Sequence, residues 1–249
     1  VSAMIKILRH LGAEIKMINK STLEIDTTHV RTNVVGHDLS KLMRASYYFI
    51  GVLLGKFNHA KVAMPGGCQF GVRPIDQHIK GFEALGASVD ISQGKITATA
   101  KKLVGTTIYM DIVSVGATIN VMLAAVLANG TTIIENAAKE PEIVDLQNAL
   151  NSMGAKIEGA GTNNIIIKGV EKLKDLSYNI IPDRIEAGTL LCSAAITGGN
   201  IKLQKVLPEH IETLLNKLEE MGCNIKINKN EVILNAPKKL KAVDIKTLP

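Results

Sequence analysis

Apolar residues recur along the chain at two spacings, which together predict short helices and strands. In four places a run with helical spacing ends in Leu or Met followed by Gly and then Ala or Cys. A strand-like alternating run follows each of them. The helical spacing is clearest at Ile143, Leu146, Leu150 and Met153. Glycine after a helix favours the left-handed conformation that closes the last turn, so the pattern predicts four helix–strand pairs joined at glycine.

These pairs recur with a regular period. The closing glycines are Gly12, Gly86, Gly154 and Gly222, with separations of 74, 68 and 68 residues. The prolines Pro74, Pro141 and Pro208 stand 67 residues apart. We expect each proline to open the helix that ends at the next glycine, because the first helical N–H has no partner to lose. A fixed period of this length is the signature of repeated structural units.

Each repeat predicts six elements in the order β-α-β-α-β-β. The first helix of each repeat is predicted at 45–54, 117–128 and 187–196. These helices are apolar nearly all round, so we expect them to be the most buried elements. The best-defined repeat predicts a strand over 106–111, an apolar helix over 117–128 and a strand over 131–135.

The repeated order predicts an α/β (α+β) fold, an inside-out, barrel-like prism with helices inside and sheets outside. The chain contains the second half of one repeat, three further repeats and a lone strand predicted over 242–247. Because Val1 falls inside a predicted helix, we expect the natural start to be missing.

Composition narrows the classes of function. The 249 residues are 46% hydrophobic and 21% charged, as in a globular protein. Four Tyr, four Phe and no Trp leave few aromatic rings for stacking on single-stranded nucleic acid, so we expect no nucleic-acid partner. The net charge of +6 suits an anionic ligand, but the lysines are scattered and most are interpreted as solvated surface. The longest apolar run, 115–128, is interrupted by polar residues, so we expect no membrane segment.

Three cysteines, Cys68, Cys192 and Cys223, are an odd number without CxxC spacing. This argues against a disulfide framework and against a zinc site, and it favours a reducing, cytoplasmic location. We expect no signal peptide. Cys192 and Cys223 fall in apolar surroundings and are predicted to be core residues.

The link from Met64 to Pro74 departs from the repeat. It is longer than the corresponding links in the later repeats, and it has three glycines and Cys68 between two prolines. Glycine permits close approach of the backbone to a ligand, and the nearby Arg73 could alter the pKa of the Cys68 thiol. The alternative is a flexible surface loop with an incidental cysteine.

Three stretches carry a family resemblance: KLMRAS with the PGGCQFGVRPIDQ segment, SVGATINVMLAAVLANGTTIIENAAKEPEIVD, and PDRIEAGT. They resemble the UDP-N-acetylglucosamine 1-carboxyvinyltransferases, and the resemblance covers essentially the whole chain. The PGGC..G.RP motif separates this family from the shikimate-pathway enolpyruvyl transferase of similar fold.

The resemblance implies roles for individual residues. Cys68 is the catalytic acid of the loop, takes part in handling phosphoenolpyruvate and is the residue that fosfomycin alkylates. Arg44 lies at the substrate phosphate site. The stretch that holds the uridine end comprises Arg73, Pro74, Ile75, Asp76 and Gln77. The loop that touches the diphosphate and uracil comprises Ile112, Val113, Ser114 and Val115.

Other polar residues have structural interpretations. Asp183 and Arg184 match a family motif where the chain crosses between domains, with a structural ion pair as the alternative. Glu140 and Glu142 are predicted to cap the helix opened by Pro141. His78 falls on the polar face of its helix and is predicted to be solvated.

The resemblance also implies the reaction and the domains. The enolpyruvyl group passes from phosphoenolpyruvate to the 3-hydroxyl of UDP-N-acetylglucosamine, the first committed step of peptidoglycan synthesis, without metal or cofactor. Residues 1–181 form the loop-bearing domain, and 182–249 form the opening repeat of a second domain. Because catalysis uses the cleft between two complete domains, we expect this chain to be inactive alone. The alternatives are a fragment that binds the nucleotide sugar without turnover and an RNA 3′-phosphate cyclase-like protein built from similar repeats.

Overall fold

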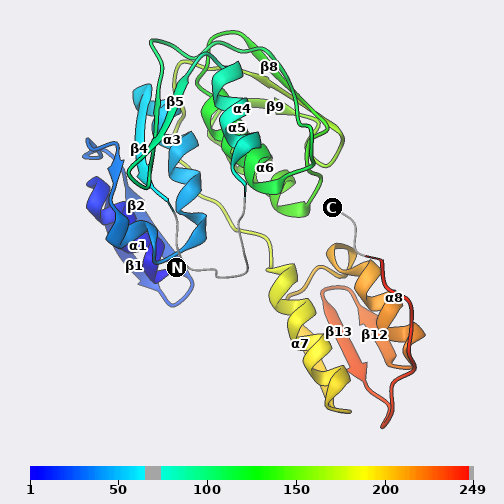
Figure 1. Cartoon of the computed structure of the whole chain (residues 1–249). Helices are drawn as coiled ribbons and strands as arrows, with labels where there is room; N and C mark the ends of the chain where they lie inside the picture. The colour runs from blue at the N-terminus through cyan, green and yellow to red at the C-terminus, as the bar shows by residue number, and fades with distance from the viewer. Residues whose placement is uncertain (65–73, 247–249) are drawn as a thin grey trace. The chain divides into compact units, whose positions relative to one another are not determined.

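The computed structural model describes residues 1–64 and 74–246 (Figure 1). The chain divides into two compact units, unit 1 (Val1–Ser177) and unit 2 (Tyr178–Pro249). Each unit has its own buried apolar cluster. Whether the units correspond to the domains 1–181 and 182–249 expected from the family resemblance stays a prediction.

Unit 1 contains half of one repeat followed by two whole repeats. The half repeat comprises α1 (Ser2–Leu11), β1 (Glu14–Asn19) and β2 (Thr22–Asp26). The next comprises β3 (Val34–Val35), α2 (His37–Ser40), the 3-10 helix η1 (Arg44–Tyr47), α3 (Tyr48–Phe57), β4 (His59–Ala63), α4 (Asp76–Ala84), β5 (Ser88–Ser92) and β6 (Lys95–Thr99). The last comprises β7 (Thr107–Tyr109), α5 (Val115–Ala125), β8 (Thr131–Glu135), α6 (Pro141–Ser152), β9 (Lys156–Glu158) and β10 (Asn164–Lys168).

Sheet topology confirms the repeat. One four-stranded sheet has the order β3-β4-β6-β5 and another has the order β7-β8-β10-β9. In both, the first pair of strands is parallel and the other pairs are antiparallel. The mixed α/β class is therefore confirmed. The sheets formed by the described residues are separate and close no barrel, so the complete prism stays a prediction.

The closing glycines behave as their position predicts. Gly12, Gly86, Gly154 and Gly222 have φ values of 106°, 93°, 94° and 100°. These values lie in the left-handed region that a residue with a Cβ atom rarely adopts. Each glycine turns the chain out of its helix and into the strand that follows.

The opening prolines follow the prediction less closely. Pro141 is the first residue of α6 as expected, but α4 begins at Asp76, two residues after Pro74. Pro208 opens a 3-10 turn, and the α-helix begins later. Proline fixes its own φ and needs no N–H partner, which suits a 3-10 turn as well as an α-helix. The helix expected at 117–128 runs from Val115 to Ala125, because the Ser114 hydroxyl accepts the Ala117 N–H and starts it earlier.

Unit 2 contains α7 (Arg184–Ile196), β11 (Asn200–Gln204), η2 (Pro208–His210), α8 (Glu212–Glu220), β12 (Asn224–Asn228) and β13 (Glu231–Asn235). Its strands form one antiparallel sheet in the order β11-β13-β12. Residues 178–183 contain no first strand of the repeat, and residues 242–246 contain no strand where one was predicted. Both predictions are wrong, because a strand needs a neighbouring edge to bond with and these residues pair with no described strand.

The prediction that the apolar helices are the most buried elements holds in unit 1 and fails in unit 2. One face of α7, with Ala187, Leu191 and Ala195, packs on its sheet, whereas Ile196 is 80% exposed. Cys192 was predicted to be core and is exposed, since it lies on the open face of α7. Cys223 is buried as predicted.

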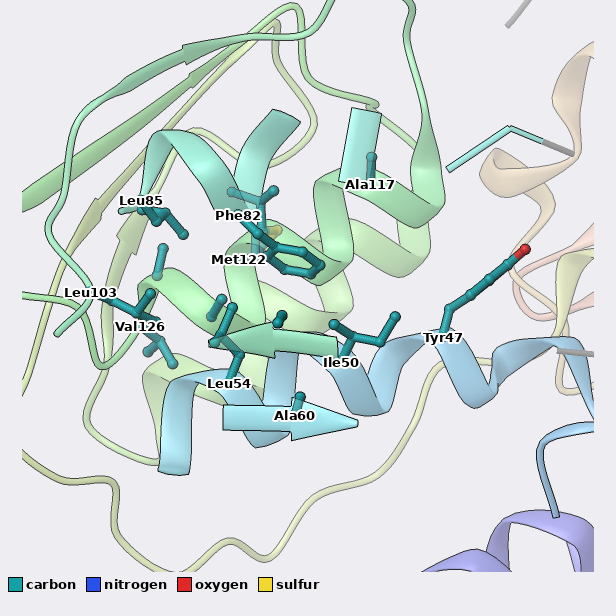
Figure 2. Close-up of a cluster of buried hydrophobic side chains, with 14 of the residues drawn as sticks. Tyr47, Ile50, Leu54, Ala60, Phe82, Leu85, Leu103, Ala117, Met122 and Val126 are labelled. Atoms are coloured by element: carbon teal, nitrogen blue, oxygen red, sulfur yellow. The ribbon is translucent and has the colours of Figure 1, made fainter. Parts of the chain in front are cut away.

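The core of unit 1 forms where α3, α4 and α5 meet. Ile50, Leu54, Phe82 and Met122 are each at most 2% exposed, and Figure 2 shows their side chains pointing toward one another. Gly51 lets α3 approach α5 closely, because a Cβ atom there would lie 2.4 Å from the Asn120 carbonyl oxygen. No described helix is long and apolar enough to cross a membrane.

A methyl group at this contact should therefore be costly. We expect Gly51→Ala to lower the free energy of unfolding by about 1–3 kcal/mol, because the two helices must separate to admit it. Gly36→Ala is the matched control, since a Cβ there meets nothing within 4 Å and is expected to change stability by less than about 0.5 kcal/mol. Urea unfolding measures both, and equal effects would refute the close-contact explanation.

Candidate functional site

Hydrogen bonds tie the first turn of α4 to the loop before α5. The Gln77 side chain is buried, and its Oε1 accepts the Asp111 backbone N–H at 2.9 Å. Its Nε2 donates to Asp111 Oδ2 at 3.3 Å and to Asp76 Oδ2 at 3.1 Å. Two stretches predicted to hold the nucleotide, the start of α4 and residues 112–115, are therefore held next to each other.

Asp111 is the charged group at this junction. Lys80 Nζ lies 2.7 Å from Asp111 Oδ1, and this bond, together with the one from Gln77, lowers the pKa of the Asp111 carboxyl. Both ion-pair side chains are well exposed, so the pair adds little to stability. The ion pair instead orients the Asp111 carboxylate toward Lys80 and Gln77 of α4.

The predicted residues of the two stretches fall into exposed and buried sets. Pro74 and Asp76 are exposed, whereas Ile75 is buried and anchors the start of α4 in the core. In the second stretch, Ile112 is 63% exposed, while Val113 and Val115 pack partly against the core. Ile75, Val113 and Val115 therefore fix the two stretches against the core, while other residues of the stretches stay at the surface.

Arg44 reaches the same region through aromatic contacts. Its guanidinium carbon lies 5.8 Å from the centre of the Tyr47 ring. The Tyr47 ring centroid lies in turn 5.5 Å from that of His78. Tyr47 is at one end of the core cluster (Figure 2). A cation over an aromatic face is held in a preferred orientation, so Arg44 is positioned toward α4.

His78 was predicted to be solvated, and that prediction is wrong. Its side chain is only 7% exposed, and its Nδ1 lies 2.9 Å from the Asn120 amide nitrogen. The signal that was missed is Asn120, a polar residue inside an apolar helix, which needs buried partners. The pKa of His78 is lowered to about 4, mainly by burial and also by the positive charge of Arg44, while Asp76 opposes the shift. The imidazole is therefore neutral at pH 7.

The structure describes only some of the remaining predicted residues. Cys68 and Arg73 lie outside the described residues. Asp183 belongs to unit 2, where it caps α7 by accepting the Ile185 and Glu186 backbone N–H groups at 2.8 and 3.1 Å. A helix-capping role of this kind accounts for the position of Asp183 in the motif.

The two glutamates beside Pro141 differ. Glu142 lies in the first turn of α6, where an acid suits the helix dipole. The Glu140 side chain makes no capping hydrogen bond, contrary to the prediction. Among residues 1–64 and 74–246, no group of three or more His, Cys, Asp or Glu side chains could hold a metal ion.

Unit 2 has an open groove of about 770 Å³ along α7. Arg184 and Cys192 are among its lining residues, together with the turn that precedes α8. The other described residues of the predicted site belong to unit 1.

The sequence is closely similar to several named proteins. The model of the EPSP synthase (3-phosphoshikimate 1-carboxyvinyltransferase) family matches residues 1–249. A Clostridium acetobutylicum protein named UDP-N-acetylglucosamine 1-carboxyvinyltransferase 2 is 57% identical over 245 residues, 98% of this chain and 58% of that protein. A Caldanaerobacter subterraneus protein named UDP-N-acetylglucosamine 1-carboxyvinyltransferase 3 is 52% identical. The match covers 100% of this chain and 60% of that protein. The chain thus spans under two thirds of these relatives.

Solved structures share the fold. The enolpyruvyl transferase NikO from Streptomyces tendae matches with a TM-score of 0.81 and 21% identity, over 96% of this chain and 58% of that one. EPSP synthase from Acinetobacter baumannii matches with a TM-score of 0.65 and 19% identity. The match covers 94% of this chain and 55% of that one. At these identities the likeness shows the fold alone.

The buried His78 predicts a pH dependence of stability. Its pKa is about 4 in the folded chain against an ordinary value of 6.5, so the unfolded chain binds more protons between these values. We expect the free energy of unfolding to fall by about 2–3 kcal/mol from pH 7 to pH 4.5 through this group. Urea unfolding of His78→Gln should lose that component, while the exposed control His29→Gln should keep it. Equal slopes for His78→Gln and the wild type would contradict the prediction.

Proposed function

The chain belongs to the EPSP synthase (3-phosphoshikimate 1-carboxyvinyltransferase) family, and we propose that it is part of an enzyme that transfers the enolpyruvyl group from phosphoenolpyruvate to the 3-hydroxyl of UDP-N-acetylglucosamine. The observation that carries this proposal is the 57% identity to a relative named for that reaction, over 98% of the chain. The reaction is the first committed step of peptidoglycan synthesis. The free thiols of Cys192 and Cys223 and the nature of the substrates support a cytoplasmic location.

Identity also favours the nucleotide sugar over 3-phosphoshikimate as the acceptor. The chain is 48–57% identical to relatives named for UDP-N-acetylglucosamine, against 19% to a solved EPSP synthase. The description of the family model names 3-phosphoshikimate, so the model by itself does not favour the nucleotide sugar. The acceptor is therefore the part of the proposal that an experiment must test most directly.

Unit 1 supplies the groups that a nucleotide diphosphate requires. Arg44 offers a guanidinium fork, and the start of α5 at Ser114 offers backbone N–H groups at the positive end of a helix. Gln77 holds residues 112–115 beside the first turn of α4, which carries Asp76. We assign the uridine diphosphate to this region.

Cys68 and Arg73 are proposed to act from the loop between β4 and α4. In the proposed reaction the sugar 3-hydroxyl adds to C2 of phosphoenolpyruvate as its proton is removed, and C3 gains a proton from Cys68. Phosphate then leaves C2, and C3 gives up a proton to form the enolpyruvyl ether. A positive neighbour such as Arg73 stabilises a thiolate and so favours proton transfer from Cys68.

Calorimetry with two acceptors tests the binding part of the proposal. We expect the chain to bind UDP-N-acetylglucosamine and not shikimate 3-phosphate. Arg44→Met should weaken binding by about ten- to a hundredfold, because a hydrogen bond to a charged group is lost. The exposed Arg31→Met makes the same change in charge and should have little effect. Binding of shikimate 3-phosphate alone would overturn the choice of acceptor. Binding of UDP-N-acetylglucosamine without turnover would mean that this chain binds the nucleotide sugar but does not catalyse the transfer.

Intact mass tests the role of Cys68. After incubation with fosfomycin and UDP-N-acetylglucosamine, we expect a single adduct that requires the nucleotide sugar. Cys68→Ser should abolish the adduct, and Cys192→Ser, which removes an exposed thiol, should leave it unchanged. An adduct that persists in Cys68→Ser would contradict the assignment.

A further inference from the structure

Asn120 is a buried polar residue that bonds to three other parts of unit 1. It lies in α5 with 0% exposure. Its Oδ1 accepts the Gly51 backbone N–H of α3 at 3.0 Å. Its Nδ2 lies 3.1 Å from the Tyr47 carbonyl oxygen and 2.9 Å from His78 Nδ1. The proposed function gives this residue no role.

These partners fix which atoms carry protons. A backbone N–H can only donate and a backbone carbonyl can only accept, so Gly51 and Tyr47 together set the orientation of the Asn120 amide. Both Nδ2 protons are then donated, one to the Tyr47 carbonyl and the other to His78. Nδ1 of His78 must therefore accept, which leaves the proton of the neutral imidazole on Nε2.

The protonated edge of His78 faces the first turn of α5. A Cβ atom on Gly116 would lie 3.2 Å from His78 Cε1 and 3.3 Å from Nε2. These distances are shorter than ordinary van der Waals contact, so a side chain at position 116 would push the ring away. His78 is 93% buried, and its Nε2 makes no hydrogen bond to the residues that the structure describes. Within residues 1–64 and 74–246 this donor therefore has no partner, and it lies beside the helix start to which the diphosphate is assigned.

We propose that Asn120 is a positioning residue that holds His78 in the Nε2–H form, so that the neutral imidazole donates to the ligand's diphosphate beside Gly116. This inference rests on the proposed function. The backbone N–H groups at the start of α5 and the His78 Nε2–H are all neutral donors in a partly buried place. They bind an anion without the desolvation cost of burying a further cation.

The first test is the protonation state of His78 in the wild-type chain. Nitrogen NMR should show the Nε2–H form, and the Nε2 resonance should shift when UDP-N-acetylglucosamine is added. An Nδ1–H form, or an Nε2 resonance that ligand leaves unchanged, overturns the inference. This measurement needs no variant, so it holds even if a substitution at position 120 prevents folding.

The second test is the pH profile of affinity in Asn120→Asp. A carboxylate next to Nδ1 can only accept, so it moves the imidazole proton to Nδ1 and turns an Nε2 lone pair toward the diphosphate once His78 is neutral. We expect affinity for UDP-N-acetylglucosamine to fall about tenfold as the pH rises through the new pKa of His78. Wild-type affinity should show no such step above pH 5.5. Arg44 and Asp76 are the charged groups that act on His78, and they are present in both proteins.

Thr118→Val is the matched control. Thr118 is fully buried in the same helix, and its Oγ1 accepts the Ala138 N–H at 3.2 Å. It should lose stability as Asn120→Asp does but keep the wild-type pH profile. The same profile in both variants overturns the inference and leaves the proposed function intact. If the wild-type chain binds no UDP-N-acetylglucosamine, the proposed function fails and the inference with it.

Discussion

The close contact between α3 and α5 is the constraint on which unit 1 depends. These two helices come from consecutive repeats, and Gly51 brings the backbone of α3 against Asn120 of α5. The Asn120 side chain hydrogen-bonds across the contact, and both of its donor protons and its acceptor oxygen are used. In a low-dielectric core such a fully satisfied amide specifies one arrangement of the helices, whereas a purely apolar contact would tolerate sliding.

The proposed ligand region follows from that arrangement. α4 packs on α5, so the first turns of both helices lie near each other, and Gln77 then fixes the loop before α5. Tyr47 ends the 3-10 turn that carries Arg44, and the same residue offers its carbonyl to Asn120. The groups assigned to the diphosphate thus come from three elements that one buried amide holds in register. An error in helix packing would misplace all of them together.

Local features of the fold could be predicted from the sequence, because their causes are local. The closing glycines have left-handed φ values, and the strand predicted at 131–135 is β8. Properties that depend on distant partners could not. His78 lies on a polar helix face, yet it is buried because Asn120, 42 residues away, supplies a partner. Cys192 lies in an apolar run, yet it is exposed because burial requires a second surface. The stretches around Ile75 and Ser114 were identified by family resemblance, whereas the hydrogen bonds of Gln77 that join them appear only in three dimensions.

The difference between the two units shows what a single repeat can and cannot do. α3, α5 and α7 occupy the same place in their repeats, and α7 is the least apolar of the three. α3 and α5 cover each other, so polar and small residues such as Asn120 and Gly51 can be buried at their contact. α7 has its own sheet on one face, but Ile185 and Ile196 on the other are largely exposed. A repeat therefore determines its elements and their order by itself, whereas the burial of its apolar helix comes from a neighbouring repeat. The same holds for the ligand region, because His78 belongs to one repeat and both Asn120 and Gly116 belong to the next.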